Sequence, residues 1–185
     1  MEAWYLVCYE PGKEKLYRAQ LSLSLKNITV FCPMLRTWRP RTDCNGVRPF
    51  IEPLFRGYLF AYLDPEVIHP SRIEEECSGV SKFVRYGQEI KPLPASVMDT
   101  LMALPACADE RDVVPKAAKQ EKAAQRPYRP PRKRKQRMSN PSPLQSVLYD
   151  KISRIVSTDN EMQRTAMFLA LTKSFHDHTD HPGNR

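Results

Sequence analysis

The chain has 185 residues, with 29 Lys and Arg against 21 Asp and Glu, which gives a formal charge of +8 and a pI of about 9.3. This length fits one domain, or one domain with an appendage. Hydrophobic residues make up 41% of the chain, which excludes a wholly disordered or collagen-like protein. No apolar run reaches the ~18 residues of a membrane helix, and the first residues lack the order of a signal peptide. We therefore expect a cytoplasmic protein that does not contact a membrane.

The sequence carries none of the residue groupings that catalysis or metal binding requires. The five cysteines are scattered and form no CxxC pair, so they are interpreted as reduced thiols rather than a disulfide framework or a zinc site. Three of the four histidines lie in the last ten residues, which are more typical of a frayed polar tail than of a metal site. Without a nucleophile–base group or a phosphate loop, the protein is predicted not to be an enzyme and to need no cofactor.

Residues 1–107 alternate between strand and helix patterns. In chain order we expect strands at 3–9 and 28–35, a hairpin turning at Asn45-Gly46, a central strand at 57–63 and a strand at 79–86, with helices at 13–27, 66–76 and 96–104. Pro11-Gly12 ends the first strand, and Leu16, Ala19 and Leu23 can share one helical face. This order predicts an α+β fold in which helices pack on an antiparallel sheet.

The positive charge is concentrated in the segment 108–141, which we interpret as a linker. Residues 116–137 hold ten Lys and Arg against one acid, a net of +9, which leaves −1 for the rest of the chain. The segment is rich in proline and has no apolar periodicity, so it cannot bury enough surface to offset its ordering entropy. It is either a self-repelling spacer or a tether that condenses on phosphates.

Residues 142–176 form a second segment with helical periodicity, followed by a disordered tail at 177–185. Ser142 can cap a first helix whose apolar stripe consists of Leu144, Val147, Leu148, Ile152, Ile155 and Val156. Residues 158–161 fit a capping box that opens a second helix. Its expected apolar side contains Met162, Ala166, Leu169 and Phe175, widened by Met167, Phe168 and Leu171. The sequence therefore predicts a helical hairpin.

Several collinear blocks in residues 3–104 together resemble the NGN domain of the NusG family. The blocks are Trp4-Tyr5-Leu6, Arg18-Ala19-Gln20, Pro33-Met34, Glu52-Pro53-Leu54-Phe55, Gly57-Tyr58-Leu59-Phe60, Asp64-Pro65-Glu66-Val67-Ile68-His69, Gly79-Val80-Ser81 and Phe83-Val84-Arg85. The pattern is most similar to the specialised RfaH branch and to its plasmid-borne relatives called ActX. The resemblance implies a transcription elongation or antitermination factor, and the ActX likeness suggests conjugation genes as a target.

In that family the NGN domain binds the clamp helices of the RNA polymerase β′ subunit and bridges to the β subunit, which suppresses pausing and termination. By position, the surface for the clamp helices comprises Leu54, Phe55, Tyr58, Phe60 and Phe83. Aromatic anchors on a rigid strand suit a helix-binding surface, although half of these residues would otherwise be sheet core. The contact to β falls at His69, followed here by an altered Pro70-Ser71, so His69 and Ser71 are the expected residues.

RfaH also reads an element of the non-template DNA strand, and this chain differs at the positions that read it. The matching residues are Ser22, Leu25, Lys26 and Ser78, so recognition of the same element is not expected. Basic groups that track phosphates and an aromatic that stacks on a base are instead expected at Lys13, Lys15, Arg18, Lys26, Arg36, Trp38, Arg39 and Arg41. The alternative for each basic group is a solvated side chain.

The C-terminal hairpin has a counterpart in RfaH, where a helical hairpin masks the clamp-helix surface. The match implies an ion pair between Glu52 and Arg164 that would hold the hairpin over Tyr58 and Phe60. Ordinary NusG proteins carry a KOW barrel instead, but the segment after Pro143 has a single glycine, at 183, and too few residues for five strands. No barrel, no fold switch and no recruitment of the ribosome are therefore expected. The alternative is that the hairpin recruits another partner or dimerises, with Arg164 solvated.

Two functions follow from these patterns. The first is a monomeric elongation factor that binds RNA polymerase and the non-template DNA strand. The second, which rests on charge alone, is a general nucleic-acid or ribosome-binding protein with a basic tether. Binding without sequence preference, and no binding to polymerase, would favour the second.

Overall fold

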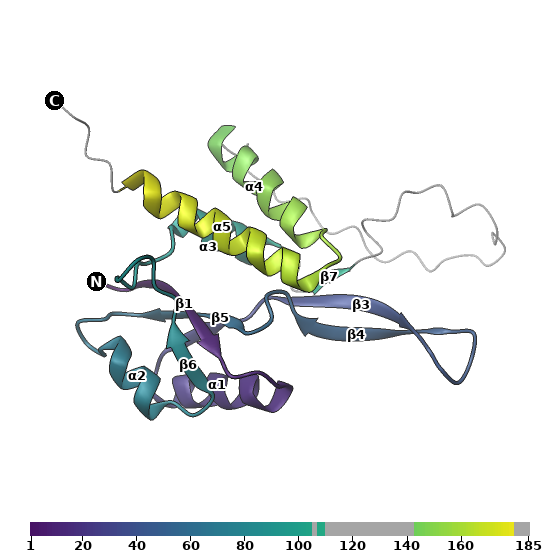
Figure 1. Ribbon diagram of the computed structural model, residues 1–185, viewed down its shortest axis with the longest axis horizontal. Helices are drawn as coiled ribbons and strands as arrows, with labels where there is room; N and C mark the ends of the chain where they lie inside the picture. The colour runs from purple at the N-terminus through teal and green to yellow at the C-terminus, as the bar shows by residue number, and fades with distance from the viewer. Residues whose placement is uncertain (105–106, 110–142, 180–185) are drawn as a thin grey trace, which may run out of the picture.

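The computed structural model describes residues 1–104, 107–109 and 143–179 (Figure 1). The basic segment 116–137 and nearly all of the predicted linker lie outside the described residues, as do the last six residues of the predicted tail. The described elements form an α+β fold, which confirms the predicted fold class.

A four-stranded antiparallel sheet lies at the centre of the N-terminal domain. Its strand order is β2-β5-β1-β6, built from β1 (Ala3–Tyr9), β2 (Thr29–Phe31), β5 (Tyr58–Leu63) and β6 (Val80–Phe83). The apolar runs in β1 and β5 are paired along almost their whole length, from Ala3 opposite Leu63 to Cys8 opposite Tyr58. These two strands are internal to the sheet and are covered on both faces. Their sequences are therefore almost continuously hydrophobic.

One face of this sheet is covered by α1 (Lys13–Leu25) and α2 (Pro70–Glu76). The predicted face of α1 is correct, because Leu16 and Leu23 are buried against sheet residues. Asn27 has a φ of 59° and ends α1. The backbone at Gly79 comes so close to α1 that a Cβ there would lie 2.6 Å from the carbonyl oxygen of Lys15.

A long hairpin, β3 (Met34–Pro40) and β4 (Val47–Pro53), projects from the domain (Figure 1). Its turn contains the predicted Asn45-Gly46. The single strand expected at 28–35 was wrong, since the chain is divided at residues 32–33 between β2 and β3. Pro33 has no N–H to donate to a ladder, while its carbonyl accepts from the Leu54 amide at 2.8 Å.

A short strand that the sequence did not predict, β7 (Cys107–Asp109), pairs in parallel with β3. Two other predicted elements are shorter in the structure. The helix expected from residue 66 begins at Pro70, where proline occupies the first turn, and the strand expected to reach residue 86 ends at Phe83.

The second face of the central sheet is covered by three helices, α3 (Ala95–Ala103), α4 (Pro143–Val156) and α5 (Glu161–Thr179). In Figure 1 they lie on the side of the sheet opposite α1 and α2. The predicted helical hairpin is therefore confirmed, and the described C-terminal residues contain helices rather than a barrel.

The side of α5 that faces the domain agrees with the predicted one in part, since Phe168 and Leu171 are buried and Met167, Leu169 and Phe175 are half-buried against the same cluster. The buried residues of α5 are Arg164, Phe168, Leu171, Thr172 and His176, which follow one helical stripe. Three of them, Arg164, Thr172 and His176, are polar, so the periodicity of apolar residues does not identify this stripe. Met162 was expected to face the domain and is 83% exposed. Asn160 caps the start of α5, because its Oδ1 accepts from the amide of Gln163 at 3.1 Å.

Candidate protein-interaction face

The sheet face beneath α5 is aromatic and aliphatic. Phe60 points to this face while its neighbour Leu59 points to α1 and α2, as the two-residue period of a strand requires. Leu54 and Phe55 reach the same face from the connection between β4 and β5, and Tyr58 is half-buried at its border. Four of the five residues predicted from the resemblance therefore lie together.

The C-terminal hairpin covers this face. Phe168 of α5 stacks on Phe55 with ring centroids 4.2 Å apart and an angle of 21° between the planes. The same ring meets Phe60 edge-on, at 5.8 Å and 85°. Ile152 and Ile155 of α4 belong to the same buried cluster. The cover leaves Phe55 1% exposed and Phe60 0% exposed, so a partner cannot reach them in this arrangement.

Arg164 joins the hairpin to the domain at the edge of this cluster. Its side chain is 3% exposed. Nη1 donates to the carbonyl oxygen of Leu54 at 3.3 Å, and Nε and Nη2 donate to that of Thr158 at 3.0 and 2.8 Å. A guanidinium can serve both carbonyls at once because its donors form a rigid planar fork. Arg164 is thus buried and bonded, which excludes the solvated alternative in this structure.

The contacts that the structure gives for Glu52 and Arg164 have other partners than the expected one, and a direct ion pair between the two residues stays a prediction. In the part of the chain that the structure describes, Glu52 pairs with Arg39 at 3.0 Å across the β3–β4 hairpin. Arg164 reaches the same segment two residues later, at the Leu54 carbonyl. A charged contact between the hairpin and the domain joins Arg56 and Glu161, at 3.5 Å. Nothing in the local pattern around Arg56 distinguished it from a solvated arginine.

A second contact that the sequence did not predict lies further along α5. His176 is 7% exposed and packs its ring on Tyr86, with centroids 4.2 Å apart. Burial raises the pKa of the Tyr86 phenol. The histidine expected in a frayed tail is thus part of the cover, because α5 continues to Thr179.

Phe83 does not share the aromatic face. It is buried on the opposite side of the sheet, where its ring meets Tyr5 edge-on at 6.4 Å. His69 and Ser71 are exposed at the start of α2, where the amide of Ser71 donates to His69 Nδ1 at 3.3 Å. These two residues are accessible, whereas Phe83 serves the fold.

Most of the basic residues expected to contact DNA are already paired with acids. Lys15 pairs with Glu10 at 2.5 Å, and Arg41 with Asp43 at 2.6 Å. Lys26 pairs with Glu76, and Arg39 with Glu52. Arg18 is exposed on α1, and Arg36 and Trp38 are half-buried on β3; the side chain of Lys13 lies outside the described residues. Four of the expected DNA-binding cations are therefore paired with acids while their side chains stay partly exposed.

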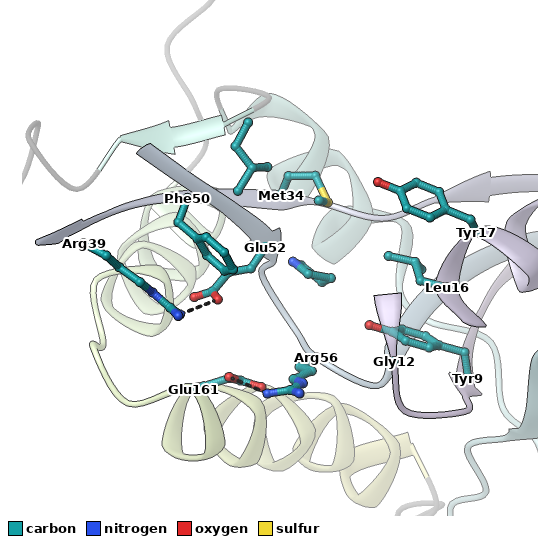
Figure 2. A pocket seen from close by; sticks show the side chains of 12 residues that line it. Tyr9, Gly12, Leu16, Tyr17, Met34, Arg39, Phe50, Glu52, Arg56 and Glu161 are labelled. Carbon is teal, nitrogen blue, oxygen red and sulfur yellow. Dashed lines mark hydrogen bonds and ion pairs between the residues drawn. The ribbon is translucent and has the colours of Figure 1, made fainter. Parts of the chain in front are cut away.

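A cavity of about 260 Å³ lies where α1, the β3–β4 hairpin and the start of α5 meet (Figure 2). Tyr9, Leu16 and Tyr17 form one side and Met34, Ile51 and Pro53 belong to the other. The ion pairs Arg39–Glu52 and Arg56–Glu161 border it. The cavity therefore touches both the N-terminal domain and the C-terminal cover.

The family of the chain is decided by its N-terminal part. The family model described as "Transcription termination factor nusG" matches residues 2–102, which is more than half of the chain. This chain belongs to the NusG family. It is therefore a transcription factor of a non-enzymatic family that acts with RNA polymerase. The matched range contains the central sheet and the aromatic face, while α4 and α5 lie beyond it. Among the described helices, none is long and apolar enough to cross a membrane.

Proposed function

We propose that this NusG-family protein is a specialised elongation and antitermination factor of the RfaH type, which binds the β′ clamp helices through its aromatic sheet face. The observation that supports this is the position of Leu54, Phe55 and Phe60, which resemblance assigns to the clamp helices and which here hold a pair of helices. A surface that buries one helical hairpin is suited to bind another.

We further propose that α4 and α5 are autoinhibitory. Helices of 14 and 19 residues are marginal alone in water, so their order depends on a surface to pack against. While the cover is docked, polymerase and α5 compete for Phe55 and Phe60. Release of the cover exposes the face. The apparent affinity for polymerase is then the intrinsic affinity of the open form multiplied by the fraction of molecules that are open.

The proposed contacts with β and with DNA lie on exposed parts of the domain. His69 and Ser71 are accessible for a polar contact to β. Arg18 and the β3–β4 hairpin are available to the non-template strand, where Trp38 would stack on a base. The paired residues Lys15, Lys26, Arg39 and Arg41 would have to exchange a carboxylate for a phosphate. Contacts to phosphates fix the position and orientation of the protein on the DNA and contribute little to sequence preference.

The function is tested by transcription with purified RNA polymerase on templates that carry the protein's own operon leader and a strong pause. We expect shorter pauses and more readthrough of a terminator when the protein is present, and loss of the effect in Tyr58→Ala. Met102→Ala, at a 43% exposed residue of α3, is the matched control and should behave as the wild type. No effect on pausing, together with equal binding to any polynucleotide, would favour a general nucleic-acid-binding protein.

A further inference from the structure

The β3–β4 hairpin places two arginines directly opposite one another. Arg39 of β3 is the cross-strand partner of Arg48 of β4. Directly opposite residues of an antiparallel pair project from the same face with Cβ atoms about 4.5–5.5 Å apart, and like charges at such positions destabilise the pairing. The fold of the hairpin therefore does not account for this pair of charges.

The side chain of Arg39 extends along the hairpin away from the turn. Arg48, Phe50 and Glu52 lie on one face of β4, because side chains of a strand alternate between its two faces. The guanidinium carbon of Arg39 lies 4.1 Å from the centroid of the Phe50 ring, and Nη2 of Arg39 donates to Glu52 Oε2 at 3.0 Å. Two neighbours thus hold Arg39 over this face, while 53% of its side chain stays exposed.

Arg48 differs from its two neighbouring arginines in charge pairing. Arg39 pairs with Glu52, and Arg41 pairs with Asp43 at 2.6 Å. Within residues 1–104, 107–109 and 143–179, Arg48 forms no ion pair, and its side chain is exposed. The face that carries Arg39 and Arg48 therefore has one more cation than its acids neutralise.

We propose that Arg39 and Arg48 together bind a phosphate group of a single-stranded nucleic acid. A phosphate between the two guanidinium groups replaces their mutual repulsion by charge-assisted hydrogen bonds, because each planar fork matches two phosphate oxygens. Arg39 exchanges the carboxylate of Glu52 for the phosphate, whereas Arg48 has no ion pair to break within the described residues. Arg48 is thus added to the residues expected to contact DNA.

A nucleic-acid strand suits this site better than a free phosphate ion. Arg36 and Trp38 lie on the opposite face of β3 from Arg39, at the alternate positions of the strand. A strand that crosses the hairpin places a phosphate on one face and a base against Trp38 on the other, and each added contact increases the affinity. A single ion reaches one face only. That the strand is non-template DNA rests on the proposed function, whereas the phosphate contact does not.

The Arg39–Arg48 site is accessible while the cover is docked. The turn end of the hairpin projects beyond the described helices (Figure 1). Arg164 of α5 contacts the carbonyl of Leu54, which follows the other end of β4. Binding at the site can therefore be measured with the full chain.

The site is tested by measuring how the affinity of the full chain for a short single-stranded DNA depends on salt. The logarithm of the affinity falls with that of the salt concentration by about 0.7 for each phosphate contact of a single strand. Arg48→Gln should therefore lower this slope by about 0.7 and weaken binding about fivefold at about 0.1 M salt. Arg48→Lys keeps the charge and should keep the slope. All variants retain the basic segment 116–137, so a difference between two variants reports on the substituted residue.

Arg72→Gln is the matched control, because it removes one charge from α2, where the Arg72 side chain is 72% exposed. It should leave the slope unchanged. In ¹⁵N spectra, the Nε–H signals of Arg39 and Arg48 should shift saturably with the DNA and not with inorganic phosphate at the same concentration. Hydrogen exchange in β3 and β4 of Arg48→Gln should be unchanged or slower, since a repelled charge is removed.

Four results would each overturn the site. These are an unchanged slope in Arg48→Gln, an equal loss of slope in Arg72→Gln, equal shifts with inorganic phosphate, and faster exchange in β3 and β4 of Arg48→Gln. The last would show that Arg48 serves the fold of the hairpin. Because polymerase is absent from these measurements, their outcome is independent of the transcription assay.

Discussion

Phe168 of α5 lies flat on Phe55 of the N-terminal domain, with the two ring centroids 4.2 Å apart. The contact joins residues 113 positions apart in sequence, and Phe60 closes it from the side. A residue that the resemblance assigns to polymerase binding is therefore the residue on which the cover stacks. While this contact is formed, Phe55 is buried beneath α5.

Removal of this ring should loosen the cover. We expect Phe168→Ala to cost roughly 3–5 kcal/mol of docking free energy, the usual effect of truncating a buried phenylalanine. Hydrogen exchange should become faster in α4 and α5, while α1, on the other face of the sheet, should keep its protection. Met162→Ala, at an 83% exposed residue of the same helix, is the control. Unchanged exchange in α5 would show that the stack does not hold the cover.

Arg164 and Glu52 should respond differently to substitution. Arg164→Met leaves the Leu54 carbonyl without its buried donor, which should cost about 1–3 kcal/mol and accelerate exchange in α5. Glu52→Gln should leave α5 unchanged, because Glu52 pairs with Arg39 on the neighbouring strand. Equal destabilisation of α5 by both substitutions would instead support a direct Glu52–Arg164 ion pair.

Two glycines with positive φ provide a matched pair for stability. Gly79 and Gly57 have φ values of 88° and 85°, so alanine is strained at both. At Gly79 the added Cβ would also lie 2.6 Å from the Lys15 carbonyl and 2.8 Å from the Ala19 amide, whereas at Gly57 it meets nothing within 4 Å. We expect Gly79→Ala to lower the melting temperature clearly more than Gly57→Ala. Equal losses would contradict this packing of β6 against α1.

The thiols of Cys32 and Cys44 should react with an alkylating reagent at different rates at a given pH. Burial raises the pKa of Cys32 to about 12, so its reactive thiolate is scarce at pH 8 and increases as the pH approaches that value. Cys44 is exposed in the hairpin turn. Mass spectrometry of peptides after iodoacetamide treatment at pH 8 should find Cys44 modified well before Cys32. Similar rates for the two thiols would show that Cys32 is accessible.

The elements of the N-terminal domain could be predicted where the pattern is local. The apolar runs of β1 and β5, the face of α1 and the turn at Asn45-Gly46 are each determined within a few residues, and the structure places them as expected. The pairing of β7 with β3 could not be predicted, since three residues carry no pattern of their own and depend on a distant strand.

The face of α5 shows why contacts between the hairpin and the domain were harder to predict. Hydrophobic periodicity favoured Met162, but the buried stripe includes Arg164, Thr172 and His176, whose burial depends on partners elsewhere in the chain. The resemblance placed Arg164 against the segment around Glu52, and the structure adds a contact to that segment at the Leu54 carbonyl. A contact to a backbone carbonyl could not be predicted, because no residue pattern encodes it.

The central claim is that α4 and α5 cover the face that binds polymerase, and it is tested most directly by the affinity for purified RNA polymerase. Binding of the full chain should be compared with that of Phe168→Ala and of the Met162→Ala control. The claim predicts tighter binding by Phe168→Ala, by at least tenfold, and no change for Met162→Ala. Equal or weaker binding by a folded Phe168→Ala protein would contradict it.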